Sequence, residues 1–352
     1  MKNKALLVTA LIALVATPGL TENSQPMKLL ACVVACLCLS PEKAFKIFPH
    51  HWAVFRWLVW AAIGCILSPF PSLAIYGFHL RYEGLITFVL LVYLAFEWSK
   101  NMELGAIGWI GSALSVAYLL LIPLLHDTEL SWLMLPKVPM AGLLAVAFGV
   151  AYHQNRWLGL PIIACGMATG SRSFILCAGL AVACSECLKT ENLHIKRIVV
   201  LASLLIVSVA ILPFTPLAGK LKNTEFSGTG ARAQWILQAD TLSKSIYPWG
   251  LGLDTGSTWL KDPKAVYAEK GAISDKVHNV FYDILVCTGW VGLIIVFLGL
   301  GSCIYHAFYY PTIRNEAAAI GILCYMVFGV MNPTGIPATA LMLICVFNLK
   351  RL

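Results

Sequence analysis

The sequence predicts an all-α polytopic membrane protein with about twelve transmembrane helices and one large loop outside the bilayer. Hydrophobic residues make up 59% of the 352 residues and charged residues only 12%, whereas soluble domains carry about 25% charged residues. The apolar residues also form runs long enough to cross a bilayer. One polar stretch, about 215–277, interrupts them. Residues 1–352 are therefore expected to form a single integral membrane domain.

The expected spans are runs of roughly 15–23 apolar residues. They cover 4–20, 27–40, 52–68, 84–98, 104–125, 138–153, 157–170, 173–188, 198–214, 278–305, 316–331 and 337–349. The basic start Met1-Lys-Asn-Lys4 is typical of a signal peptide, but Pro18 and the poor match to a cleavage site predict an uncleaved first helix.

Lysine and arginine are distributed unequally between the two sides of these spans, and this predicts their orientation. With a cytoplasmic N-terminus, thirteen lie on the inner side: Lys2, Lys4, Lys43, Lys46, Arg56, Lys100, Arg156, Lys189, Lys196, Arg197, Arg314, Lys350 and Arg351. The short outer loops carry four, Lys28, Arg81, Lys137 and Arg172. Loop 215–277 then faces outward. The net charge of +8 follows mostly from this bias and does not indicate nucleic-acid binding.

Loop 215–277 is expected to contain one amphipathic helix. Its apolar positions recur at helical spacing at Ala231, Trp235, Ala239, Leu242 and Ile246. Thr229 is a candidate cap, and Pro248 ends the pattern. We expect this helix to lie on the membrane, with Trp235 inserted toward the interface.

The rest of the loop predicts a turn-rich segment and then another helix. Residues 248–256 contain three glycines and a proline, which predicts irregular backbone close to another element. Ser274 is expected to cap a helix that carries His278 and Asn279 in its first turns and continues into span 278–305.

Four polar positions on the expected outer face are candidates for chemistry: Arg81, Arg172, Arg232 and His278. Each has a common structural role, because an arginine at a helix end often reaches the lipid headgroups and an interfacial histidine is often structural. Glu83 can also neutralise Arg81. Arg172 is the sharpest candidate, because a basic residue on the outer side opposes the positive-inside bias.

Taken together, these residues suit a diphosphate. Arg232 lies in the first turn of the expected loop helix, where free N–H groups favour an anion, and guanidinium groups bind phosphate oxygens in pairs. His278 can accept a proton near neutral pH. The acidic residues of the loop are scattered without metal-ligand spacing, so we expect a metal-independent reaction without a cofactor.

The order of these motifs resembles the O-antigen ligase and O-antigen polymerase superfamily over about residues 169–292. Arg172 stands in Ser-Arg-Ser, and Arg232 precedes Trp235 and the sequence Pro-Trp249-Gly-Leu-Gly. His278-Asn279 opens a span that contains Gly-Trp-Val-Gly. Arg172, Arg232 and His278 match that superfamily's outer-face arginine, loop arginine and histidine. The remainder of the chain is similar only in hydropathy.

The resemblance implies an inverting glycosyltransferase of the membrane-embedded C type, in the bacterial inner membrane with its active site facing the periplasm. It would transfer a glycan from undecaprenyl diphosphate to a hydroxyl of lipid A core or of another glycan. Arg172 and Arg232 would hold the diphosphate, and His278 would activate or orient the acceptor. Arg81, Asn279, Trp235 and Trp249 are the expected substrate contacts.

Two questions stay open at this point. The sequence does not separate a ligase from a polymerase or from a protein-glycosylating relative. The alternative class is a secondary transporter or flippase of a lipid-linked sugar. Ionisable groups are few within the spans, and the two halves show no inverted similarity, so the enzyme is favoured. A scaffold role would leave the outer arginines and the histidine unexplained.

Overall fold

The computed structural model describes residues 49–77, 83–125, 137–189, 229–244, 247–259, 277, 279–332 and 336–349. These residues form helices joined by turns, with no strand among them. The helices are α3 (Pro49–Ile66), α4 (Pro71–Tyr76), α5 (Leu85–Asn101), α6 (Gly105–Leu125), α7 (Lys137–Gln154), α8 (Arg156–Ala168), α9 (Arg172–Lys189), α11 (Thr229–Ser243), α12 (Gly256–Trp259), α13 (Val280–Tyr309), α14 (Ile313–Met331) and α15 (Ile336–Asn348). The all-α class is confirmed for this part of the chain.

Nine of the expected spans coincide with described helices, α3, α5, α6, α7, α8, α9, α13, α14 and α15. The expected spans 4–20, 27–40 and 198–214 lie outside the described residues. By length and composition, α13 and α14 can each cross a membrane, and α5 with α6 could form a third span that is bent by 113°. Several other apolar helices are shorter than the roughly 20 residues that a crossing needs.

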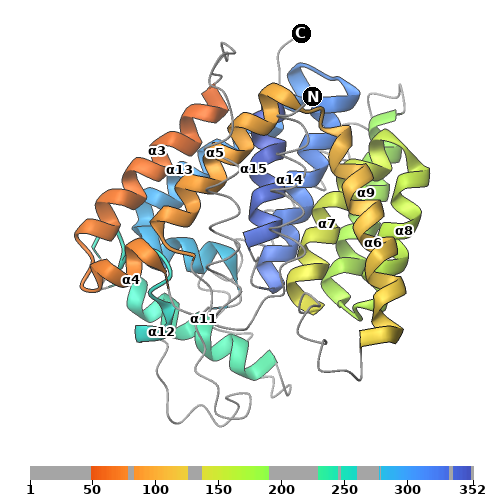
Figure 1. The fold of residues 1–352 in the computed structure, drawn as a ribbon. Coiled ribbons are helices and arrows are strands. Elements are labelled where there is room, and N and C mark those ends of the chain that lie inside the picture. Colours follow the sequence, from red (N-terminus) through yellow and green to blue (C-terminus); the bar gives the residue numbers. More distant parts are fainter. Residues whose placement is uncertain are drawn as a thin grey trace.

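Helix α7 lies between α14 and the helices α8 and α9 (Figure 1). Every residue from Met140 to Ala151 is buried, and α7 packs against α6, α8, α9, α14 and α15. Small residues allow the close approach: a Cβ on Gly149 would lie 3.1 Å from Cys324 Sγ of α14 and 3.3 Å from the backbone nitrogen of Gly321. Small residues at helix contacts are typical of membrane bundles, where packing rather than water exclusion holds helices together.

Helix α13 is broken at Gly289, whose φ of 68° and ψ of −176° are not helical. The break frees backbone carbonyls near the end of the first half-helix, and groups from two other segments bind them. Leu251 N–H donates to Val286 O (2.9 Å), Gly252 N–H to Cys287 O (3.0 Å), and Trp60 Nε1–H to Thr288 O (2.8 Å). Because each carbonyl has a protein donor, the break is stable inside an apolar bundle.

The glycines of the two segments permit this docking. A Cβ on Gly289 would lie 1.9 Å from Pro248 O, and one on Gly250 would lie 2.5 Å from Cys287 O. Gly250 and Gly252 also have positive φ angles, which glycine adopts without steric cost. The expected irregular backbone close to another element is present over residues 248–255, whereas Gly256 begins α12.

Gly289→Ala is expected to destabilise the protein, because it combines a positive φ with a backbone clash; strain of this kind costs about 1–3 kcal/mol. Gly301→Ala is the matched control, since it lies in the same helix and its Cβ would meet nothing within 4 Å. Thermal unfolding in detergent should show a lower midpoint for Gly289→Ala only. Equal midpoints would mean that the break is not a fixed feature of α13.

Candidate functional site

The elements that carry the expected site residues meet at one end of the bundle, which we call the loop end. It comprises α11, α12, the first turns of α9 and α13 and the last turn of α14. Figure 1 shows α11 and α12 across this end, below the other helices. Helix α11 packs on α13, and hydrogen bonds described below join α13 and α9 to the last residues of α14.

His278 lies outside the described residues, but both of its neighbours are described and buried, Val277 at 0% and Asn279 at 1% exposure. The backbone N–H of Val277 donates to Asp283 Oδ1 at 2.9 Å. Asn279 is the N-cap of α13: its side-chain oxygen accepts from Phe281 N–H (3.0 Å) and Tyr282 N–H (3.3 Å). The chain on either side of His278 is therefore fixed to α13.

This geometry corrects one expectation. Helix α13 begins at Val280 and its cap is Asn279, so the expected cap at Ser274 is wrong. Asn279 also donates from its side-chain nitrogen to Val330 O of α14 at 3.3 Å. Accepting from α13 and donating to α14 at once satisfies both ends of the buried amide. These contacts give Asn279 a structural role, and its expected contact with substrate stays a prediction.

Arg172 is the first residue of α9, and its side chain lies outside the description. The serines on either side have defined roles. Ser171 Oγ accepts from Phe174 N–H at 3.4 Å, as a helix cap does, and Ser173 Oγ accepts from Asn332 Nδ2. The Ser-Arg-Ser motif therefore holds Arg172 between two anchored residues at a helix N-terminus.

Asn332 links the end of α14 to the start of α9. It is the C-cap of α14, lies two residues after the carbonyl that Asn279 binds, and donates to Ser173. The last turn of α14 thus links the segment next to His278 with the segment next to Arg172.

Arg232 is the fourth residue of α11, in its first turn as expected, and its side chain is also outside the description. The structure has a helix at these residues, Thr229–Ser243, but its environment differs from the expected one. Trp235 and Ala239 are buried in the main core, at 8% and 0% exposure. The expectation that Trp235 inserts into the membrane interface is wrong, because the apolar face of α11 packs on protein.

Arg81 and Trp249 are the two remaining residues that are expected to contact substrate. Arg81 lies outside the described residues. Trp249 is partly buried and stacks on Tyr247, with ring centroids 5.0 Å apart and planes 3° apart. Tyr247 is 60% exposed, so the pair presents an aromatic surface beside the break in α13.

A cavity of about 160 Å³ lies between α3, α5, α13, α14 and α15. Its lining is mainly apolar, and its acidic residues are Glu83, Asp254 and Asp283. Asp254 Oδ2 accepts from the backbone N–H of Glu83 at 3.0 Å, and its φ of 54° is left-handed. Asp254 therefore anchors the chain two residues after Arg81, as Asp283 anchors the chain one residue before His278.

Neither Asp254 nor Asp283 is among the site residues predicted from the sequence. A signal for Asp283 was present, because it is the only acidic residue between 278 and 305 and an acid within an apolar span is costly and usually marks a functional site. Asp254 carries a weaker signal, since aspartate tolerates left-handed backbone in glycine-rich turns.

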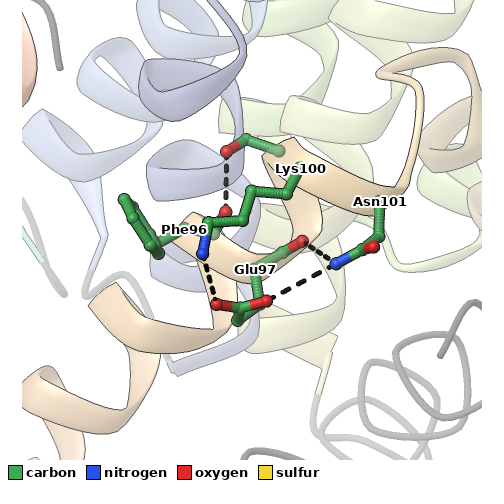
Figure 2. Close-up of polar contacts among 5 residues, drawn as sticks. Phe96, Glu97, Lys100 and Asn101 are labelled. Atoms are coloured by element: carbon green, nitrogen blue, oxygen red, sulfur yellow. Dashed lines mark hydrogen bonds and ion pairs between the residues drawn. The ribbon is translucent and has the colours of Figure 1, made fainter. Parts of the chain in front are cut away.

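A second group of polar contacts lies at the opposite end of the bundle. Figure 2 shows Lys100 Nζ donating a hydrogen bond to Glu97 Oε1, with Asn101 donating to the same glutamate. The distance from Lys100 Nζ to Glu97 Oε1 is 2.8 Å. The two charged side chains are 7% and 2% exposed. Nearby helix ends are joined in a similar way, since His153 lies 3.0 Å from both Ser185 Oγ and Glu316 Oε2. These groups bind one another and tie helix ends together.

Among the described residues, no group of three or more histidine, cysteine or acidic side chains could hold a metal ion. No protein-family model matches the chain, and no curated protein shows significant similarity to it.

Proposed function

We propose that this protein is a membrane glycosyltransferase of the O-antigen ligase or polymerase type. One observation carries the proposal: the three expected catalytic positions all belong to helix N-termini at the loop end. Arg172 opens α9, Arg232 lies in the first turn of α11, and His278 immediately precedes the cap of α13. Helix N-termini attract anions through free N–H groups and the helix dipole, which suits a diphosphate donor.

The proposed reaction is a single displacement at the anomeric carbon. His278 accepts the proton of the acceptor hydroxyl as its oxygen forms the new glycosidic bond. The bond between the anomeric carbon and the diphosphate oxygen breaks, and undecaprenyl diphosphate leaves with both electrons. Arg172 and Arg232 neutralise the charge on that leaving group, and this stabilisation is greatest in the transition state.

The protein would cross the bacterial inner membrane about twelve times, in a C-type glycosyltransferase-like arrangement, with the loop end in the periplasm. Membrane lipid would surround it, and lipid A core or a second glycan would be the acceptor. The cavity beside α13 resembles in volume a cavity that holds one benzene molecule, so it has room for only a few carbons of the prenyl chain.

A second candidate, a transporter or flippase of a lipid-linked sugar, is favoured by the break in α13, because transporters bind ions and substrates at broken helices. The carbonyls of Val286, Cys287 and Thr288 at this break, however, already accept bonds from protein groups. The buried pair Glu97–Lys100 lies in the last turn of α5, away from mid-span. The enzyme therefore remains the better supported function.

A deletion strain tests the proposed function through its lipopolysaccharide bands. Loss of every long band, with accumulation of lipid-linked polymer, is expected for a ligase. Bands limited to core plus one repeat are expected for a polymerase. A band pattern in the deletion strain that is identical to the wild-type pattern would contradict both assignments.

A further inference from the structure

The segment that leads into α13 is held by a carboxylate from within the same helix. Asp283 Oδ1 accepts from the backbone N–H of Val277 at 2.9 Å, and Val277 is fully buried. Asp283 N–H in turn donates to Asn279 O at 3.0 Å. The backbone at Val277 is therefore held against the first turn of α13.

From this geometry we infer that Asp283 is a positioning residue for His278. Its carboxylate holds the backbone N–H of Val277, one residue before His278, and the side chain of Asn279, one residue after His278, caps α13. This role rests on the proposed function, in which His278 accepts the proton of the acceptor.

The carboxylate of Asp283 is a strong hydrogen-bond acceptor at this position for two physical reasons. A hydrogen bond from a backbone N–H to a carboxylate is shorter and about twice as strong as one between neutral groups. Asp283 also lies in the first turn of α13, where the helix dipole stabilises a negative charge. An ionised carboxylate at this position is therefore a firm anchor in otherwise apolar surroundings.

The arrangement goes beyond an ordinary helix cap. In a capping box, the acidic side chain reaches back to the N-cap N–H, three residues earlier. Here the cap bonds come from Asn279, and Asp283 reaches six residues back to Val277, past both the cap and His278. This bond therefore fixes the backbone at Val277, next to His278, and capping of α13 does not require such a bond.

The test compares Asp283→Ala and Asp283→Asn in the purified full chain. The first measurement is hydrogen exchange at the Val277 amide. In Asp283→Ala the exchange rate should rise by about tenfold or more, because a bond to a charged acceptor is lost. In Asp283→Asn the amide oxygen can still accept, so most of the protection should remain.

The second measurement is transfer from an undecaprenyl-diphosphate-linked glycan, with donor binding measured separately. Asp283→Ala should lower kcat by about 10- to 100-fold, the usual cost of misplacing a reacting group by an ångström or less. Donor affinity should stay close to that of the wild type. Asp283→Asn should recover most of the lost kcat.

Thr312→Ala is the matched control. Thr312 caps α14 at the opposite end of the bundle, where its Oγ1 accepts from Asn315 N–H at 3.0 Å. It should lose helix-cap stability without a change in kcat per folded molecule. If Asp283→Ala behaves in the same way, its role is only structural and the inference is overturned.

Two other outcomes would also overturn it. Unchanged exchange at Val277 in Asp283→Ala would show that the carboxylate does not hold this segment. An inactive Asp283→Asn with full protection at Val277 and a shifted pH–rate profile would show that the carboxylate acts on the imidazole charge directly. A wild-type protein that transfers no glycan refutes the proposed function instead, while the exchange result still decides whether Asp283 anchors Val277.

Discussion

His278→Ala is expected to lower the rate of glycan transfer by about 100- to 10,000-fold, the range that a general base contributes. The buried neighbours of His278 are fixed by Asp283 and by the cap of α13, so the backbone at this position should survive the substitution. Donor binding should fall much less than the rate, because Arg172 and Arg232 would still hold the diphosphate.

Purified protein in detergent allows binding and transfer of a lipid-linked glycan to be measured separately. His194→Ala is the control, since His194 lies in the stretch between Lys189 and Lys196 that is expected on the cytoplasmic side. It should retain both activities. Equal losses of binding and transfer in His278→Ala would make His278 a binding residue and leave the proton acceptor unassigned.

Arg232→Ala is expected to reduce transfer by about 100-fold or more, the usual effect of removing one group that stabilises transition-state charge. Arg172→Ala should have an effect of similar size. Arg232→Lys should restore little of the activity, because lysine keeps the charge but lacks the planar pair of donors that matches phosphate oxygens. The protein should still reach the membrane in each case.

The control for this series is Arg156→Lys. Arg156 pairs with Glu186 at 2.6 Å at the other end of the bundle, and both side chains are substantially exposed. A single exposed pair contributes little to stability, so this variant should transfer at the wild-type rate. Full activity in Arg232→Lys would contradict paired binding of the diphosphate by Arg232.

Hydropathy predicted the positions of nine described helices, because apolar runs and helix lengths are both local properties of the chain; the short helices α4 and α12 carry no such run. The break in α13 could not be predicted in this way. A glycine such as Gly289 is compatible with an unbroken membrane helix, and its positive φ depends on docking of residues 248–252, about forty positions earlier in the chain.

The errors at the candidate site have similar physical causes. An apolar helix face packs equally well on lipid and on protein, so the spacing around Trp235 could not show that α11 covers α13. Ser274 and Asn279 are both good caps by residue type. Asn279 is the cap in the structure, and its side-chain nitrogen also reaches Val330 of α14. Contacts between distant segments, such as Asn332 with Ser173, leave no mark in local sequence patterns.

The most direct test of the central claim uses purified protein in liposomes with an undecaprenyl-diphosphate-linked glycan and a hydroxyl acceptor. The expected result is a new glycosidic product and one released undecaprenyl diphosphate for each glycan transferred. Movement of the intact lipid-linked sugar across the bilayer without cleavage would contradict the glycosyltransferase assignment and support the transporter.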